Sequence, residues 1–266
     1  MFARVLCVLT LCLASTAHAA DDEGFVTLFD GKDLSEWIIP EGDNGHWKIL
    51  EGVIDYDAKS EAKGNKNLVS KKEYEDFILK IEWRLKETPY TNPRIPYVLP
   101  DGTHARGVDG KPLTLALPDS DSGVYLRDVK GKSQVNMWCW PIGSGEVYGY
   151  RMDAKLPPAV RKGVTPKTQA DKPVGEWNDF EIKLVGDRLT VVLNGVTVIE
   201  DAQLPGIPEK GPLSLQHHGG FRDGKYTGPP SLVQFRNIKI KPLPRKSAAK
   251  ADDRGAASSG FKQATR

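Results

Sequence analysis

The sequence predicts an all-β protein, an antiparallel β-sandwich of the jelly-roll type. Two observations support this fold class. Short segments of alternating apolar and polar residues follow one another closely, and Gly, Asp and Asn fill the turns between them. No segment between the two ends of the chain shows a helical period of any length. These features are typical of a sandwich in which each strand buries one side.

The expected strands begin at residue 25 and end at residue 240. The clearest is 76–86, where apolar side chains alternate with charged ones. Tight hairpin turns are expected at Glu51-Gly52 and Asn194-Gly195, because Gly and Asn tolerate the positive φ that such turns require. The other expected strands are 25–29, 47–50, 53–56, 179–184, 188–193, 196–199, 213–218 and 232–240.

The two ends of the chain differ in character from the strands. Residues 1–19 hold one arginine, an apolar run and Ala17-His18-Ala19, the small-x-small pattern of a signal-peptide cleavage site. We therefore expect a signal peptide over 1–19 and a secreted or periplasmic protein that begins at Ala20. No membrane span is expected, because the apolar run is shorter than the ~20 residues that a span needs.

A single domain is expected over residues 20–243, followed by a basic, disordered tail over 244–266 that is rich in Ala, Ser and Gly. Without the leader and the tail, acidic groups slightly outnumber basic ones, so no nucleic-acid partner is expected. Cys139 is the only cysteine of the expected mature chain, which excludes an intramolecular disulfide. The sequence leaves the oligomeric state open.

One stretch, residues 119–150, has an alternation that ordinary surface strands lack. Two strands are expected in it, at 124–128 and 134–140. Their outer side chains are Tyr125, Arg127, Gln134, Asn136, Trp138 and Trp140. Exposed tryptophans are costly to hydrate, whereas aromatic rings beside amides suit the C–H faces and hydroxyls of sugars. This side is therefore either a second packing layer or, as we expect, a groove for a carbohydrate ligand.

Three further segments are expected to reach this groove. Gln216 and His218 share one side of their strand and continue the polar side chains of the groove. Glu146 and Tyr148 lie in the loop that follows the second groove strand. A long Pro-rich loop at 88–118 is expected to rim or partly cover the groove.

Several separated motifs then occur in a characteristic order. They are 29–37, Trp47 with 51–54, 74–77, 122–127, 175–178, 193–195, 211–218 and 235–238. In this order they resemble the 3-keto-disaccharide hydrolase domain family, formerly a domain of unknown function. The resemblance covers nearly all of residues 25–243.

The resemblance implies a concanavalin A-like jelly roll and an enzyme, a glycoside hydrolase or lyase, that acts on 3-keto-glycosides. A ketone at C3 acidifies the C2 proton, so a base and a group that stabilises the enolate oxygen can expel the C1 substituent. Such a reaction needs no nucleotide or redox cofactor. The alternative is a carbohydrate-binding module without catalysis.

The sequence departs from the family pattern in the groove. Where the family commonly has Glu-x-Gln, this chain has Gln134-Val135-Asn136, so an amide replaces a carboxylate. We therefore expect His218 or Glu146 to act as the base and Arg127 to hold the enolate oxygen. The residues expected to bind substrate are Tyr125, Gln134, Asn136, Trp138, Trp140, Tyr148 and Gln216.

A metal site is left open, and no cofactor is certain. Asp119, Asp121 and the turn at Gly123 resemble part of a calcium loop, but the other ligands of such a loop are missing. A divalent cation shared by His218 and Glu146 is the other possibility, provided that the fold brings these side chains together.

Overall fold

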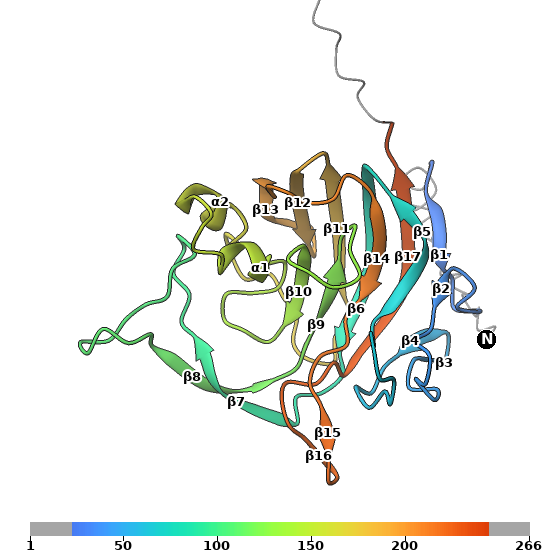
Figure 1. The fold of residues 1–266 in the computed structure, drawn as a ribbon, viewed down its shortest axis with the longest axis horizontal. Coiled ribbons are helices and arrows are strands. Elements are labelled where there is room, and N and C mark those ends of the chain that lie inside the picture. The colour runs from blue at the N-terminus through green and yellow to red at the C-terminus, as the bar shows by residue number, and fades with distance from the viewer. Residues whose placement is uncertain (1–22, 245–266) are drawn as a thin grey trace, which may run out of the picture.

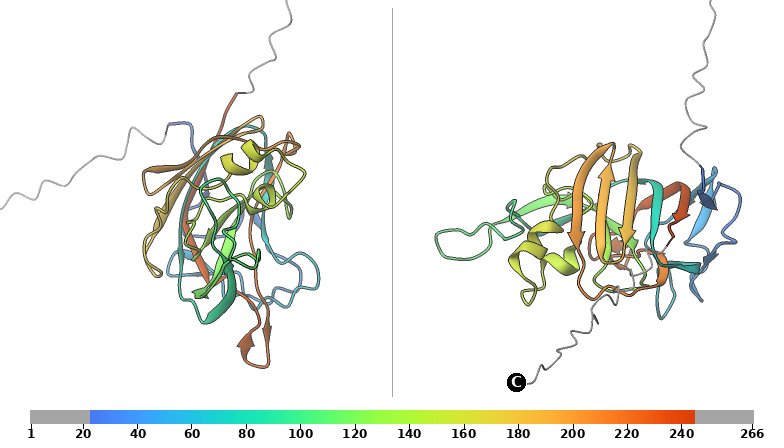
Figure 2. Two further views of the ribbon diagram at one scale, coloured as in Figure 1. Left: turned by 90° about the vertical axis from the view of Figure 1, so that its left-hand side faces the viewer. Right: turned by 90° about the horizontal axis from the view of Figure 1, so that it is seen from above.

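The computed structural model describes residues 23–244, whose two main antiparallel sheets pack face to face (Figure 1 and Figure 2). Two small hairpins lie outside these sheets, and one of them is formed by β15 (Phe221–Arg222) and β16 (Lys225–Tyr226). The larger sheet contains, from edge to edge, β13 (Val196–Gln203), β12 (Arg188–Leu193), β11 (Asn178–Val185), β6 (Phe77–Leu85), β17 (Val233–Pro242), β4 (Val53–Asp55) and β3 (Lys48–Leu50), with β1 (Val26–Phe29) also paired to β17. The expected signal peptide and nearly all of the expected tail lie outside the described residues.

The smaller sheet carries most of the residues expected in the groove. Its strands, in order, are β10 (Gln134–Trp138), β9 (Asp121–Tyr125), β14 (Gly211–Leu215), β5 (Leu68–Tyr74) and β2 (Trp37–Ile38). Two short helices, α1 (Tyr148–Arg151) and α2 (Pro158–Gly163), follow β10 in the chain. The predicted all-β antiparallel sandwich is confirmed. None of the helices in the described part of the chain is long and apolar enough to cross a membrane.

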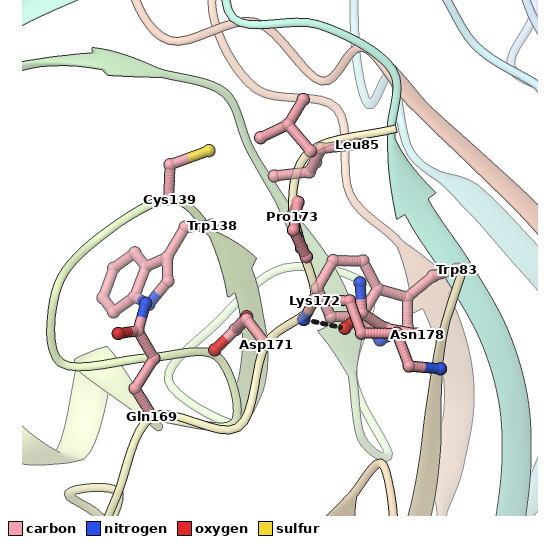
Figure 3. Close-up of a pocket in the computed structure, with 10 residues that line it drawn as sticks. Trp83, Leu85, Trp138, Cys139, Gln169, Asp171, Lys172, Pro173 and Asn178 are labelled. Atoms are coloured by element: carbon pink, nitrogen blue, oxygen red, sulfur yellow. Dashed lines mark hydrogen bonds between the residues drawn. The ribbon is translucent and has the colours of Figure 1, made fainter. Parts of the chain in front are cut away.

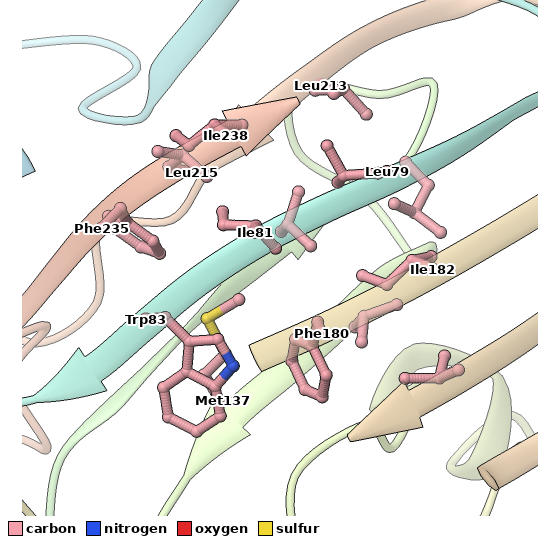
Figure 4. Close-up of a cluster of buried hydrophobic side chains, with 14 of the residues drawn as sticks. Leu79, Ile81, Trp83, Met137, Phe180, Ile182, Leu213, Leu215, Phe235 and Ile238 are labelled. Atoms are coloured by element: carbon pink, nitrogen blue, oxygen red, sulfur yellow. The ribbon is translucent and has the colours of Figure 1, made fainter. Parts of the chain in front are cut away.

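The core lies between the two sheets and is organised along β6, which pairs with β11 on one side and β17 on the other. The inward side chains of β6 are Phe77, Leu79, Ile81, Trp83 and Leu85. Met137, Leu213 and Leu215 of the smaller sheet join the same apolar cluster (Figure 4). Because the strand buries every second residue, its sequence predicts its position in the core.

The predicted tight turns are confirmed. Glu51 and Gly52, between β3 and β4, have φ values of 51° and 77°. Asn194 and Gly195, between β12 and β13, have φ values of 52° and 79°. Two consecutive residues with positive φ define the hairpin turn that matches the natural twist of the strands, and Asn and Gly adopt this conformation at low cost.

The expectation of a long loop over residues 88–118 is wrong. β7 (Tyr90–Pro96) and β8 (Thr114–Asp119) pair as a separate hairpin arm, drawn at the lower left of Figure 1. Its prolines are tolerated because each of its strands has only one neighbour and leaves one edge unpaired. The tip of the arm returns to the short helices, where the carbonyl of Gly102 and the ring of His104 contact Arg151. The arm therefore reaches the side of the sandwich on which β10 lies.

Candidate active site

The smaller sheet turns a set of polar side chains away from the core. In the register of β9 and β10, Gln134 lies opposite Tyr125 and Trp138 lies opposite Asp121. In the register of β9 and β14, Ser214 lies opposite Tyr125. Residues paired in this way share one side of the sheet. We call this side the polar face; its members are Asp121, Gly123, Tyr125, Gln134, Asn136, Trp138, Ser214 and Gln216.

The amides of the polar face form a connected network. The Nε2 of Gln134 donates to the Oε1 of Gln216, and the Nε2 of Gln216 donates to the hydroxyl of Tyr125 at 3.3 Å. An added Cβ on Gly123 would lie 2.4 Å from the Nε2 of Gln134, so glycine is needed for the amide to cross the strand here. Asn136 donates to a backbone carbonyl at 3.1 Å. All of these side chains are buried, so the network forms the base of the site.

His218 lies at the accessible end of the polar face, just beyond β14. Its side chain is 38% exposed, and its Nδ1 lies 2.7 Å from the carbonyl oxygen of Pro229. A carbonyl only accepts, so Nδ1 carries a proton and the neutral ring keeps its lone pair on Nε2. This Nε2 lies 3.7 Å from the Oδ2 of Asp121. The geometry leaves Nε2 available to take up a proton.

Two carboxyl groups lie close to His218. Asp121 is 14% exposed at its side chain, and burial raises its pKa to about 7, while a charged His218 opposes this rise and Asp119 adds to it. Burial also raises the pKa of Asp119, whose Oδ2 accepts hydrogen bonds from Asn92 at 2.8 Å and from Trp140 at 3.1 Å. The Oδ1 atoms of both aspartates have no hydrogen-bond partner among the described residues. Asp121 therefore exchanges its proton near neutral pH.

An aromatic cluster adjoins these carboxyl groups. The rings of Trp138 and Trp140 are stacked, with centroids 4.1 Å apart, and Tyr148 meets both rings edge-on at 6.2 Å. Trp138 is buried and donates to the carbonyl of Gly143, whereas Tyr148 is 40% exposed. Trp140 is partly exposed. Trp140 and Tyr148 therefore present the aromatic surface that a sugar ring can reach, and Trp138 supports it from below.

Glu146 also belongs to this side of the sheet, although it lies outside the named strands. Its carbonyl accepts from the backbone N–H of Asn136 at 3.0 Å, and the N–H of Gly145 donates to the carbonyl of Asn136 at 2.8 Å, so the segment runs beside the edge of β10. The side-chain amide of Asn136, on the polar face, also donates to the carbonyl of Glu146 at 3.1 Å, so Glu146 adjoins that face. The Oε1 of Glu146 accepts from the Nε of Arg151, and Oε2 has no partner among the described residues. Burial raises the pKa of Glu146 to about 7, against the effect of Arg151.

The expectation that Arg127 lies in the groove is wrong. It follows the end of β9 with a φ of 55°, which breaks the alternation of the strand. Its guanidinium forms an ion pair with Asp76 at 2.8 Å and donates to the carbonyls of Glu75, Gly186 and Pro208 at 2.6, 2.7 and 3.1 Å. The side chain is 1% exposed. Arg127 therefore ties strand ends together.

Three residues of this region have roles that the sequence does not predict. The sequence suggests Asp121 only as a calcium ligand, although its side chain faces His218. No motif points to Arg151 or His104, although Arg151 pairs with Glu146 and His104 accepts from Arg151 at 2.9 Å. The alternation of the strands indicates the side on which Asp121 lies. No local pattern indicates that the arm brings His104 to Arg151.

The described residues can be compared with what a metal site requires. Within residues 23–244, no three His, Cys, Asp or Glu side chains are grouped so that they could hold a metal ion. The calcium-like pair Asp119 and Asp121 thus lacks a third ligand of this kind in the described part of the chain. Its oxygens instead face a histidine, an amide and an indole.

A pocket of about 350 Å³ is lined by Trp138 and by Trp83 of β6 (Figure 3). Its lining includes Asp171 and Asn178. The Oδ2 of Asp171 accepts from the backbone of Ser144 at 3.0 Å, and the Oδ1 of Asn178 accepts from the backbone of Lys172 at 2.8 Å. These polar groups hold the loop beside β11 in place. We therefore assign the site to the polar face and not to this pocket.

Replacing Arg127 by Gln should destabilise the fold and leave the site intact. Removal of the cation leaves Asp76 buried without its partner, which should lower the free energy of unfolding by about 3–5 kcal/mol. The double variant Asp76→Asn/Arg127→Gln removes the unpaired charge and should regain part of the loss. Thermal unfolding measures both effects. An unchanged melting temperature together with a lost activity would return Arg127 to the site.

Replacing Asp121 by Asn should change how stability depends on pH. The pKa of Asp121 is raised in the fold to about 7, so the protonated form is favoured there. Its contribution to stability is complete below the ordinary pKa of about 4 and is lost as the pH rises through about 7. The melting temperature of the variant minus that of the wild type should therefore increase from about pH 4 to about pH 8. A constant difference over this range would contradict the raised pKa.

Comparison with known proteins agrees with this structure. No curated protein matches the chain. Two solved structures from Parabacteroides distasonis, each named a "putative glycosyl hydrolase", share the fold. The first has 22% identity and a TM-score of 0.50 and covers 83% of this chain and 84% of its own. The second has 19% identity and a TM-score of 0.51 and covers 83% of this chain and 95% of its own.

The sequence also matches a family model over residues 24–241, nearly the whole of the described chain. This family is described as the 3-keto-alpha-glucoside-1,2-lyase-like domain. The match includes all the strands of both sheets except the last residue of β17. The chain therefore belongs to the 3-keto-alpha-glucoside-1,2-lyase-like domain family and is a carbohydrate-active protein.

Proposed function

We propose that this protein is an enzyme that cleaves 3-keto-glycosides at C1, with His218 as the general base. The observation that carries the proposal is the accessible Nε2 of His218, which is oriented by Pro229 and lies 3.7 Å from the Oδ2 of Asp121. Membership of a family described as 3-keto-alpha-glucoside-1,2-lyase-like supports the choice of substrate class. Neutral imidazole suits a proton made acidic by an adjacent ketone.

In this mechanism the Nε2 of His218 takes the proton from C2 of the sugar. The electrons of the C2–H bond move into the ketone and give an enolate. As the enolate collapses, a C1–C2 double bond forms and the C1–O bond breaks. The protonated ring of His218 then returns its proton to the departing oxygen, so that charge and protons balance. Addition of water to the new double bond would convert the elimination into a net hydrolysis.

The other residues of the site have supporting roles in this proposal. Asp121 stabilises the protonated ring of His218 when its carboxyl is ionised, which requires a pH near or above about 7. Trp140 and Tyr148 stack against the sugar ring. Glu146 is fully buried and held by Arg151, so it acts as a positioning group beneath the site.

Replacing His218 by Ala should lower the turnover of 4-nitrophenyl 3-keto-glucoside by roughly 100-fold or more, because the base is removed. Binding of the sugar should change little. His217→Gln is the matched control: His217 faces Tyr56, with its Nδ1 2.7 Å from the hydroxyl, and glutamine retains a hydrogen-bonding group there. Release of 4-nitrophenol, with the affinity measured separately, provides the readout.

Two outcomes would contradict this function. Saturable binding of the sugar by the wild type without any turnover would show a carbohydrate-binding module, the alternative that the sequence left open. An equal loss of turnover in His217→Gln and His218→Ala would show that the neighbouring histidine has the same effect, and the assignment of the base would fail.

We also propose that the protein is exported and acts in the periplasm or outside the cell. The support is the apolar leader and the Ala17-His18-Ala19 pattern. Protein purified from the producing cell should therefore begin at Ala20, as measured by intact mass. A retained leader, or a mass that includes a lipid, would contradict this proposal.

A further inference from the structure

A second hollow of about 560 Å³ lies between the tip of the hairpin arm and the two short helices. Its lining includes His104 and Arg106 from the arm and Arg151 and Arg161 from the helical segment. No carboxylate is among the described residues that line it. The wall is built firmly: an added Cβ on Gly102 would lie 2.7 Å from the Oγ1 of Thr165, so the arm sits directly on the helices.

The arginines of this pocket have unused hydrogen-bonding groups. Arg151 is 1% exposed; its Nε donates to Glu146 and its Nη1 to His104, but its buried Nη2 has no partner among the described residues. The buried Nε of Arg161 likewise has no partner among the described residues. Arg106 is exposed and, among the described residues, donates only to the carbonyl of Gly110, at 2.6 Å. The buried donors that lack a partner are therefore those of Arg151 and Arg161. Buried donors of this kind normally find an acceptor.

The three guanidinium groups all affect the charge state of one side chain, the ring of His104. Its Nε2 lies 2.9 Å from the Nη1 of Arg151, which can only donate, so Nε2 accepts and the ring is neutral. Burial lowers the pKa of His104, and Arg151, Arg106 and Arg161 each lower it further. Like charges repel one another, and an anion bound between them relieves this repulsion.

Nearby acidic groups have other partners, and Asp101 accepts hydrogen bonds from the backbone and hydroxyl of Thr103. Asp153, just after α1, forms an ion pair with Lys132, and Asp109, in the arm, lies 3.7 Å from Lys111. Glu146 lies on the far side of Arg151 and neutralises only that guanidinium. The charges of Arg106 and Arg161 therefore have no carboxylate partner within residues 23–244. The pocket has the charge and the donors to hold an anion, but no anionic side chain supplies one.

We propose that this pocket is a subsite for an anionic group, a carboxylate, sulfate ester or phosphate ester, carried by the carbohydrate ligand. Planar guanidinium groups match the paired oxygens of such groups and form charge-assisted hydrogen bonds with them. Arg151 links the pocket to the polar face. It contacts Glu146, which adjoins that face, and His104, which lines the pocket. This inference rests on the proposed function only in taking the ligand to be a carbohydrate.

The test compares matched neutral and anionic ligands that the proposed reaction does not cleave, because they lack the 3-ketone. The first pair is phenyl β-glucoside and 4-carboxyphenyl β-glucoside; the second is phenyl β-glucoside and phenyl β-glucuronide. Calorimetry should show tighter binding of the acid in at least one pair. Arg161→Gln and Arg106→Gln should each weaken that binding about tenfold and leave the neutral ligand unaffected.

Arg94→Gln is the matched control, because Arg94 is an exposed arginine of the same arm that does not line the pocket. The proposal is overturned if neither acid binds more tightly than its neutral partner, or if Arg94→Gln weakens binding as much as the pocket variants do. Inorganic sulfate should compete with the acidic ligand. Sulfate binding without any preference for an acidic sugar would show an ion site only and would also overturn it. Turnover of a 3-keto-glucoside is measured separately, so failure of the proposed function would leave the binding result unchanged.

Discussion

The antiparallel register of β9 with β10 and β14 is the constraint on which the rest of the site depends. It sends Val124, Val135 and Leu215 into the core and their sequence neighbours to the polar face. A slip of one residue would exchange the two sets, which would bury amides between the sheets and expose the apolar core. The packing that stabilises the sandwich therefore also fixes the positions of the residues in the site. Core packing sets the strand register, and the hydrogen bonds between the amides make the polar face more rigid.

Burial without a full set of partners distinguishes the site from the rest of the fold. Arg127 and Asp76 are also buried, but the guanidinium has a carboxylate and three carbonyls as partners. Asp121 and Glu146 each retain an oxygen without a partner among the described residues, and burial raises the pKa of each to about 7. A carboxyl group that is taken from water without compensation keeps its proton to higher pH. Asp121 and Glu146 are buried without a full set of hydrogen-bond partners, and this is why they exchange protons near neutral pH.

Most of the fold could be predicted because every second residue of a half-buried β-strand is apolar. The same rule predicts correctly that Tyr125, Gln134, Asn136, Trp138 and Gln216 lie on one side of the sheet. The rule fails at Arg127, because the positive φ of this residue ends the alternation. No residue type in this stretch indicates the positive φ.

Two other features, the hairpin arm and its contact with Arg151, were not predicted from the sequence. The proline-rich segment concealed a hairpin, because proline is usual in loops but is also tolerated at strand edges. The contact between His104 and Arg151 joins residues far apart in the chain, and only the path of the arm brings them together. Alternation is a local signal, so it predicts the side on which a residue lies but not its distant partners.

Arg151 makes the polar face and the cationic pocket one electrostatic unit. Its Nε holds Glu146 on one side, its Nη1 holds His104 on the other, and its Nη2 has no partner among the described residues. An anion bound beside this guanidinium would share its positive charge with Glu146 and would repel the ionised carboxylate. Both effects favour the protonated form of Glu146 and so raise its pKa further. The anionic group of a ligand in the pocket would thereby change the protonation state of Glu146 beneath the sugar site.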